Sequence, residues 1–179
     1  VYSMENTRMT TIAYFEDHFV PIDQAKVSVM CNTLHYGTGC FGGIRAYWNE
    51  EEGQLYGFRF IDHYRRFLNS AKLLHCKFDH TPESLSAITV ELLQREGWQQ
   101  NVYIRPLAYK DEGVFRVWLH DSKDKLTIFS QPVGGYIKVD SLFRTNVPGI
   151  SAIGDVITMG NGPHPQLAHV SSTEGIIAA

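Results

Sequence analysis

The sequence has too little cysteine and too few long apolar runs for several large classes of protein. Its 179 residues contain three cysteines, an odd number that includes no CxxC pair, so we expect no disulfide framework. Reduced thiols are typical of the cytoplasm, and we expect a cytoplasmic protein. No run of about 18 apolar residues occurs, so we expect no contact with a membrane.

An excess of positive charge is also absent. Lys and Arg total 16 and Asp and Glu total 19, which gives a net charge of −3, and the arginines are scattered along the chain. These features argue against a nucleic-acid partner. Cys76 and His80 have a spacing that metal ligands can use, but Pro82 and the polar residues before it place His80 in a loop. We therefore predict no metal site.

The common self-contained catalytic motifs are missing. The sequence has no GxSxG, HExxH or Walker motif. The letters G-x-G-x-x-G do occur in the range 37–42. They precede a predicted strand, whereas a dinucleotide-binding turn lies between a strand and a helix, and no suitably placed acidic residue follows. We do not interpret this motif as a nucleotide site.

What the sequence does contain is a glycine-rich stretch at 35–47. Four glycines fall within seven residues here, among Tyr36, Phe41, Tyr47 and Arg45. Glycine permits left-handed backbone and close approach of other groups. One interpretation is a tight turn leading into a buried strand. The other is a turn that places aromatic side chains in a ligand pocket, and the local sequence does not decide between them.

Hydrophobic periodicity predicts an α/β protein of the α+β-like kind. We expect a small two-layer domain in which two helices pack on a mostly antiparallel sheet. The helices are predicted from Ile61 to near His75 and from Pro82 to a cap at Gly97. The predicted strands cover 11–15, 19–20, 26–30, 41–48, 54–58, 102–109 and 126–130. The range 26–30 is predicted as either a half-buried strand or an extended segment.

One of these strands contains an unusual pair of residues. Arg105 lies in the middle of an apolar strand, so its charge needs a partner or an anionic ligand. Pro106, which cannot donate a hydrogen bond, predicts a bulge or an edge strand.

The residues after the pair Gly134-Gly135 differ in pattern. We predict a strand at 136–139, a turn-rich connection at 144–149, an apolar strand at 150–153 that ends at Asp155, and a loop at 160–163. A helix is predicted from near Pro165 to the last residue, inside which the chain stops. We therefore expect a domain at 1–134 and a short strand-loop-strand-helix tail at 135–179.

Residues from about Thr10 to Gly134 resemble branched-chain amino acid aminotransferases. The motifs that carry this resemblance, in chain order, are 13–15, 19–21, 25–27, 34–38, Phe41, 43–45, 58–59, His63, Arg66, 69–72 and 103–107. The resemblance implies that pyridoxal phosphate binds between this small N-terminal domain and a larger C-terminal one. It also implies an amino acid or 2-oxo acid substrate, and it leaves a homo-oligomer open.

The resemblance assigns roles to individual residues. Arg66 matches the arginine that contacts the cofactor phosphate. Tyr36 and Phe41 match aromatic residues around the substrate's apolar side chain, and Tyr36 is implied to reach the site of a neighbouring subunit. Tyr103 and Arg105 match residues close to the substrate, with Arg105 as a partner for a carboxylate. The family commonly has an acidic residue where this chain has Gly42.

The resemblance assigns no catalytic residue. The family's Schiff-base lysine and the acid that pairs with the pyridinium nitrogen lie in its second domain. Lys123, Lys125 and Lys138 follow Lys110 here, and none has a matching context. We therefore expect that this chain contributes contacts to substrate and cofactor but does not transaminate alone.

The tail at 135–179 resembles flavoprotein disulfide reductases, above all dihydrolipoamide dehydrogenase. The matching segments are 137–140, 144–150, 152–155, 167–169 and 174–175. The resemblance implies that Asp155 contacts the ribityl chain of FAD, although the family's nucleotide-binding unit and CxxxxC pair are missing. Two alternatives therefore stay open, namely a non-enzymatic chimeric scaffold whose tail covers the small domain and a fragment of a flavoprotein of this kind.

Overall fold

The computed structural model describes residues 11–113, 122–133, 137–145, 157–159 and 162–163. The chain divides into two compact units, Val1–Val133 and Gly134–Ala179. Each unit is described here by itself.

The first unit is built on a seven-stranded antiparallel sheet. Its strand order is β2-β1-β7-β6-β4-β5, and the short strand β3 also pairs with β6. The strands are β1 (Ile12–Phe15), β2 (His18–Pro21), β3 (Cys40–Phe41), β4 (Ile44–Asn49), β5 (Gln54–Gly57), β6 (Val102–Lys110) and β7 (Asp124–Pro132).

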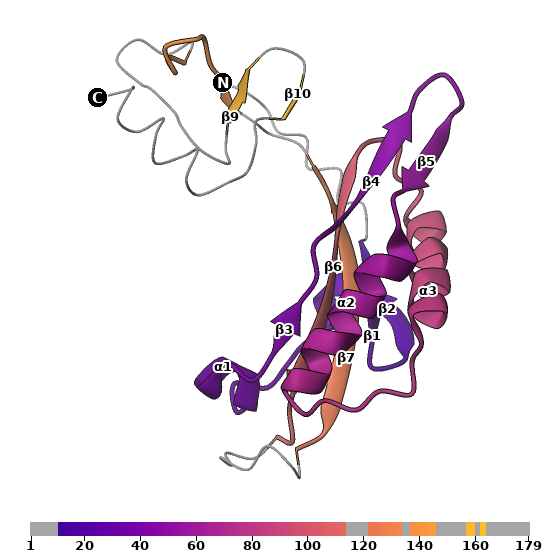
Figure 1. Ribbon diagram of the computed structural model, residues 1–179, viewed down its shortest axis with the longest axis vertical. Coiled ribbons are helices and arrows are strands. Elements are labelled where there is room, and N and C mark those ends of the chain that lie inside the picture. The colour runs from indigo at the N-terminus through magenta and orange to yellow at the C-terminus, as the bar shows by residue number, and fades with distance from the viewer. Residues whose placement is uncertain (1–10, 114–121, 134–136, 146–156, 160–161, 164–179) are drawn as a thin grey trace. The chain divides into compact units, whose positions relative to one another are not determined.

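Two long helices, α2 (Phe60–Leu73) and α3 (Pro82–Glu96), pack together against this sheet (Figure 1). The ends of α3 follow its sequence signals. The Thr81 side chain accepts from the Ser84 N–H in a capping box, and Gly97 adopts φ +64° at the C-cap. The two-layer fold with an antiparallel sheet agrees with the predicted fold class. No helix in the described part of the chain is long and apolar enough to cross a membrane.

The core lies between the helices and one face of the sheet. Alternate residues of β6 point into it, and Val102, Ile104 and Ala108 are fully buried. The intervening residues Tyr103 and Arg105 are only partly buried because they point to the other face. The core also includes Tyr64, Phe67, Ala71, Leu85, Leu92, Ile44, Ala46, Leu126 and Ile128.

The environment of Pro106 corrects one expectation. Its strand is neither bulged nor at an edge, because β6 lies between β7 and the strands β3 and β4. Phe41 pairs with Leu107 and Ile44 with Ile104, so one register places Gly42 opposite Pro106. Gly42 N–H donates to the Pro106 carbonyl at 2.9 Å, and Pro106 has no N–H to return. The predicted strand at 41–48 is therefore interrupted at Gly42 and Gly43.

The segment between β2 and β3 also differs from the predictions. The range 26–30 forms no strand in the described residues, and all five of its residues are exposed, so its alternation does not reflect a buried face. A 3-10 turn, η1 (Ile22–Gln24), and a short helix, α1 (Asn32–Tyr36), lie on either side of it. Gly37 ends α1 with φ +65°, a conformation that glycine adopts without strain.

The described part of the second unit contains three short strands. They are β8 (Ile137–Lys138), β9 (Ile157–Met159) and β10 (Gly162–Pro163), in which β9 pairs parallel with β8 and antiparallel with β10. Strand β8 was predicted, whereas Gly162–Pro163 was expected in a loop and pairs as a strand instead. The predicted strand at 150–153, Asp155 and the predicted C-terminal helix lie outside the described residues.

Candidate functional site

A stacked arginine lies on the sheet face opposite the helices. The Arg105 guanidinium carbon is 4.3 Å from the centroid of the Phe41 ring and 5.2 Å from that of Tyr103. Its Nη2 donates to the Tyr103 hydroxyl at 3.0 Å. Cation–π contacts on both rings and one hydrogen bond therefore fix the orientation of this guanidinium.

One donor of this arginine is left over. The Arg105 Nε atom is buried and has no hydrogen-bond partner among the described residues. A buried donor without a partner costs about 1–3 kcal/mol, and more when it is charged. An anion that reached Nε would remove this cost, which makes Arg105 a candidate partner for a carboxylate or a phosphate.

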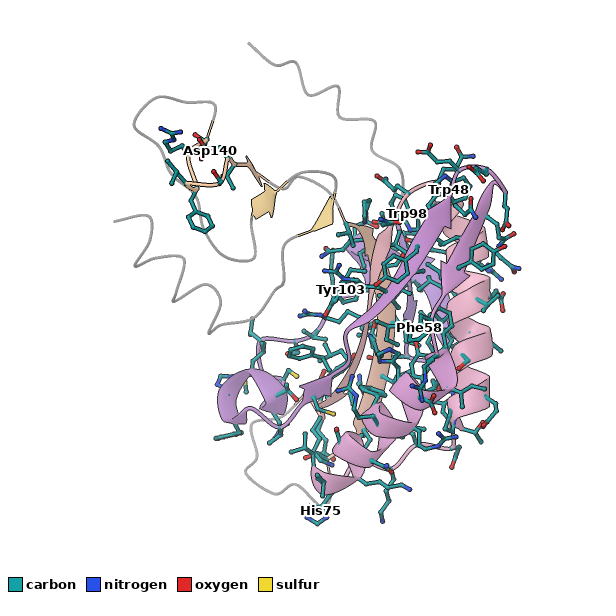
Figure 2. The ribbon with its side chains drawn as sticks, turned by 45° about the horizontal axis from the view of Figure 1, so that its top comes forward. Trp48, Phe58, His75, Trp98, Tyr103 and Asp140 are labelled. Carbon is teal, nitrogen blue, oxygen red and sulfur yellow. The ribbon has the colours of Figure 1, made fainter. Side chains whose placement is uncertain are left out.

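A pocket of about 260 Å³ lies beside Tyr103. Figure 2 shows the labelled Tyr103 on β6 and Phe58 just before α2. Gly43 leaves room for the Tyr103 phenol, because a Cβ atom at Gly43 would lie 2.8 Å from its hydroxyl oxygen. The residues that line the pocket are Gly43, Arg45, Tyr47, Phe58, His63 and Tyr103.

The α2 side of the pocket is electropositive. Burial, followed by the positive charges of Arg66 and Arg59, lowers the pKa of His63. His63 therefore holds its neutral form at neutral pH. Arg66 is exposed one helical turn beyond His63 and does not line the pocket itself. An anion at this end of the pocket would meet neutral His63 and would lie in the positive field of Arg66 and Arg59.

The structure brings together some of the predicted site residues and separates others. Phe41, Tyr103 and Arg105 form one contact group. Arg66 lies near His63. Tyr36 is on α1, where its ring centroid is 6.1 Å from that of His35, and it does not line the pocket. Asp155 lies outside the described residues.

Sequence reasoning assigned no individual site role to four pocket residues, Arg45, Tyr47, Phe58 and His63, although Tyr47 was among the aromatic residues of the glycine-rich stretch that one interpretation placed in a pocket. The alternation of β4 was a signal for two of them, because Gly43, Arg45 and Tyr47 share one face of the strand. His63 and Arg66 have the i, i+3 spacing of neighbours on a helix surface. The signal for Phe58 was weaker, because a residue between a strand and a helix has no periodicity.

Two family matches cover most of the chain. Residues 39–134 match the family described as Amino-transferase class IV. Residues 115–175 match the family described as Pyridine nucleotide-disulphide oxidoreductase. The first match contains all the pocket residues and all four members of the predicted site from Phe41 to Arg105.

Individual relatives point to the same class. A probable branched-chain-amino-acid aminotransferase of Aquifex aeolicus is 40% identical over 135 residues, which are 75% of this chain and 43% of that protein. A probable branched-chain-amino-acid aminotransferase of Synechocystis is 36% identical over 73% of this chain and 43% of that protein. This chain thus spans less than half the length of these relatives.

Solved structures share the fold. The branched-chain aminotransferase of Thermoproteus uzoniensis with norvaline has a TM-score of 0.66 and is 34% identical, over 75% of this chain and 47% of that one. The branched-chain amino acid aminotransferase of Thermobaculum terrenum in its PLP form has a TM-score of 0.62 at 27% identity, over 76% of this chain and 47% of that one.

Proposed function

This chain belongs to the class IV aminotransferase family, and from that premise we propose a function for its first unit. Residues 1–134 act as the small domain of a branched-chain amino acid aminotransferase. They bind the amino acid or 2-oxo acid substrate at Phe41, Tyr103 and Arg105, with Tyr36 as a further contact, and the phosphate of pyridoxal phosphate at Arg66. The similarity to branched-chain aminotransferases supports this choice of substrate.

The observation that carries the proposal is the buried, unpartnered Nε of Arg105. The stacking of Arg105 between Phe41 and Tyr103 keeps its guanidinium plane fixed before a ligand arrives. A carboxylate that accepts from Nε–H gains a charge-assisted hydrogen bond at little ordering cost. The exposed ring of Phe41 offers apolar surface to a branched side chain beside that carboxylate.

The phosphate end of pyridoxal phosphate fits the residues near Arg66. The guanidinium of Arg66 is exposed, and no ion pair recorded for the described residues involves it. Burial is the main cause of the lowered pKa of His63, and the charges of Arg66 and Arg59 add to it, which is consistent with a positive potential at this end of the pocket. When bound, the cofactor supplies the electron sink for transfer of the amino group. Arg66 would hold its phosphate.

The chemical step lies beyond what these residues supply. Among the lysines after Lys110, none stands in the context of the family's Schiff-base lysine. We therefore propose that this chain binds and orients ligands but does not transaminate on its own. In the same proposal Tyr36, which is 40% exposed, contacts the site of a second copy in a homo-oligomer.

The test is ligand binding by the full chain. We would titrate the ¹⁵N-labelled protein with 4-methyl-2-oxopentanoate and follow the amide signals of Phe41, Tyr103 and Arg105. Arg105→Met removes the donor, and we expect it to weaken binding about tenfold or more. Arg95→Met removes an exposed arginine of α3 and should leave the affinity unchanged.

Two results would overturn parts of the proposal. Equal affinities for wild type and Arg105→Met would remove Arg105 from the site. Turnover of leucine and 2-oxoglutarate by this chain with pyridoxal phosphate would contradict the proposal that it is inactive alone.

The match over residues 115–175 favours a second candidate function. In this alternative, residues 135–179 are a flavoprotein-derived segment, joined to the small domain in a chimera, and Asp155 contacts FAD. Purified protein would then acquire the yellow absorbance of bound flavin after incubation with FAD and gel filtration. Colourless protein would rule out flavin binding and leave the segment as a scaffold.

A further inference from the structure

A second pocket lies on the other side of α2 from the candidate site. It has a volume of about 440 Å³ and is open to solvent between the C-terminal half of α2 and the loop that leads to α3. Leu68, Cys76 and Phe78 supply its apolar surface. The polar residues and the remaining wall are Arg65, Asn69, Lys72, Lys77, His80, Thr81 and Pro82.

The charges around this pocket are mostly positive. Three cationic residues, Arg65, Lys72 and Lys77, line it, and no carboxylate does. Four carboxylates lie close by. Three of them are engaged: Asp62 binds both Arg59 and Arg65, Asp17 lies 3.3 Å from the His80 Nε2, and Asp124 pairs with Lys110. The fourth, Asp79, lies in the chain between the lining residues Phe78 and His80. No recorded ion pair of the described residues involves the ammonium groups of Lys72 and Lys77.

Hydrogen bonds with the side chains of Lys110 and Asp124 hold the loop that carries Lys77. Lys110 Nζ donates to the His75 carbonyl at 3.1 Å and to Asp124 Oδ1 at 2.6 Å. Asp124 Oδ2 accepts from the Lys77 N–H at 2.9 Å. Lys110 is only 1% exposed, so its own two bonds are largely shielded from water, whereas the Lys77 N–H bond is exposed. The backbone at Lys77 is therefore fixed, and a ligand would not have to order it.

We propose that this pocket binds a small organic anion with two negative charges on an apolar body. Lys72 and Lys77 would neutralise the charges, and the Asn69 amide can donate a further hydrogen bond. Leu68 and Phe78 would contact the apolar body. Phosphate esters and dicarboxylates share this chemistry. The site is separate from Arg66 and Arg105, so the proposal does not depend on the function proposed for the first unit.

The experiment is an NMR titration of the full ¹⁵N-labelled chain with phenyl phosphate at a pH of about 8, where the phosphate is mostly a dianion. We expect shifts at the amides of Asn69, Lys77 and Phe78. Phthalate tests a dicarboxylate on the same ring, inorganic phosphate lacks the ring, and phenol lacks the charge. At least one of the two dianions that carry a ring, phenyl phosphate and phthalate, should bind more tightly than inorganic phosphate and phenol.

Variants separate this pocket from the candidate aminotransferase site. The double variant Lys72→Gln and Lys77→Gln should weaken phenyl phosphate binding about tenfold or more, since it removes two charge-assisted contacts. Lys26→Gln, a control that removes an exposed lysine elsewhere, should have no effect. Arg66→Gln should also leave these shifts and the affinity unchanged. Circular dichroism checks that each variant is folded.

Three outcomes would overturn the proposal. The first is an absence of shifts at Asn69, Lys77 and Phe78 with both ring dianions. The second is an equal affinity for phenol, which would show that charge plays no part. The third is that Arg66→Gln loses binding while the double lysine variant binds as tightly as wild type, which would place the anion at the candidate aminotransferase site.

Discussion

The side chains on the two faces of strand β6 are held in place by different interactions. The helix-covered face presents Val102, Ile104 and Ala108, all without exposed surface. The open face presents Tyr103 and Arg105, which are stacked, hydrogen-bonded and partly exposed. The first face stabilises the fold by removing apolar surface from water, and the second keeps a partly exposed charged side chain on the open face.

This comparison shows how a small domain positions a charged group. Successive residues of a strand point to opposite faces, so burial of Ile104 against the helices fixes the direction in which its neighbours point. Arg105 needs no support from the core itself, because the two aromatic rings hold it on the open face. The binding residues can therefore vary with little effect on stability, provided that the helix-covered face is unchanged.

The largest expected effect tests this difference with two ion pairs. Lys110 and Asp124, opposite one another on β6 and β7, form a buried pair with 1% and 14% of their side chains exposed. Asp124→Asn leaves the Lys110 charge buried without a counter-ion. We expect the free energy of unfolding to fall by about 3 kcal/mol or more, measured by urea denaturation.

The matched control is the neighbouring pair of Lys125 and Glu16. Their Nζ–Oε1 distance is 2.7 Å, close to the 2.6 Å of the buried pair, but 24% and 38% of their side chains are exposed. Glu16→Gln should therefore cost less than about 1 kcal/mol, because water screens this pair. Equal losses in the two variants would show that burial does not distinguish the pairs.

A smaller effect is expected from the adjacent glycines at the break between β3 and β4. A Cβ atom at Gly42 would lie 2.9 Å from the Pro106 Cγ, inside the packed face and near Phe67. One at Gly43 would meet only the phenol end of Tyr103, which can move. We expect Gly42→Ala to lower the free energy of unfolding by about 1–3 kcal/mol.

Gly43→Ala should instead change binding more than stability. Displacement of the Tyr103 phenol would disturb its hydrogen bond with Arg105, so the affinity for 4-methyl-2-oxopentanoate should fall while the urea midpoint stays near that of wild type. The reverse pattern, a stable Gly42→Ala and an unfolded Gly43→Ala, would contradict the assignment of these two residues to opposite faces.

Local signals were sufficient to predict the two long helices and most strands of the first unit, but not the short helix α1. The Thr81, Pro82 and Gly97 signals marked both ends of α3, because capping involves residues close together in the sequence. The break at Gly42 could not be predicted, since its cause is the missing N–H of Pro106 on another strand. The alternation at 26–30 misled because exposed segments can alternate without burying either face.

The candidate site was predictable in composition but not in geometry. The resemblance indicated Phe41, Tyr103 and Arg105, and alternation could place the last two on one face. Their stacking depends on the register between β3 and β6, which pairs Phe41 with Leu107. No local pattern specifies that register. The lysines of the second pocket were missed for a similar reason, since they meet across a loop that a buried ion pair fixes.

The smallest effect that we predict concerns the carboxylate of Glu96, the last residue of α3. Glu96 accepts hydrogen bonds from Ser130 Oγ, from Trp98 Nε1 at 2.7 Å and from Ile12 N at 3.3 Å. Burial nevertheless raises the pKa of Glu96 above its ordinary value of 4.5, against the opposing effect of these donors.

The folded state therefore holds a proton at Glu96 more tightly than the unfolded state does. This contribution to stability is complete below the unfolded pKa of 4.5 and is lost as pH rises through the higher folded pKa. The stability of wild type relative to Glu96→Gln should thus decrease as pH rises above about 4.5, because glutamine does not titrate. Urea denaturation of both proteins at a series of pH values measures this difference, in which the other carboxyl groups cancel. A difference that grew with pH would mean that the three donors outweigh burial, and that Glu96 stabilises the fold as an ion.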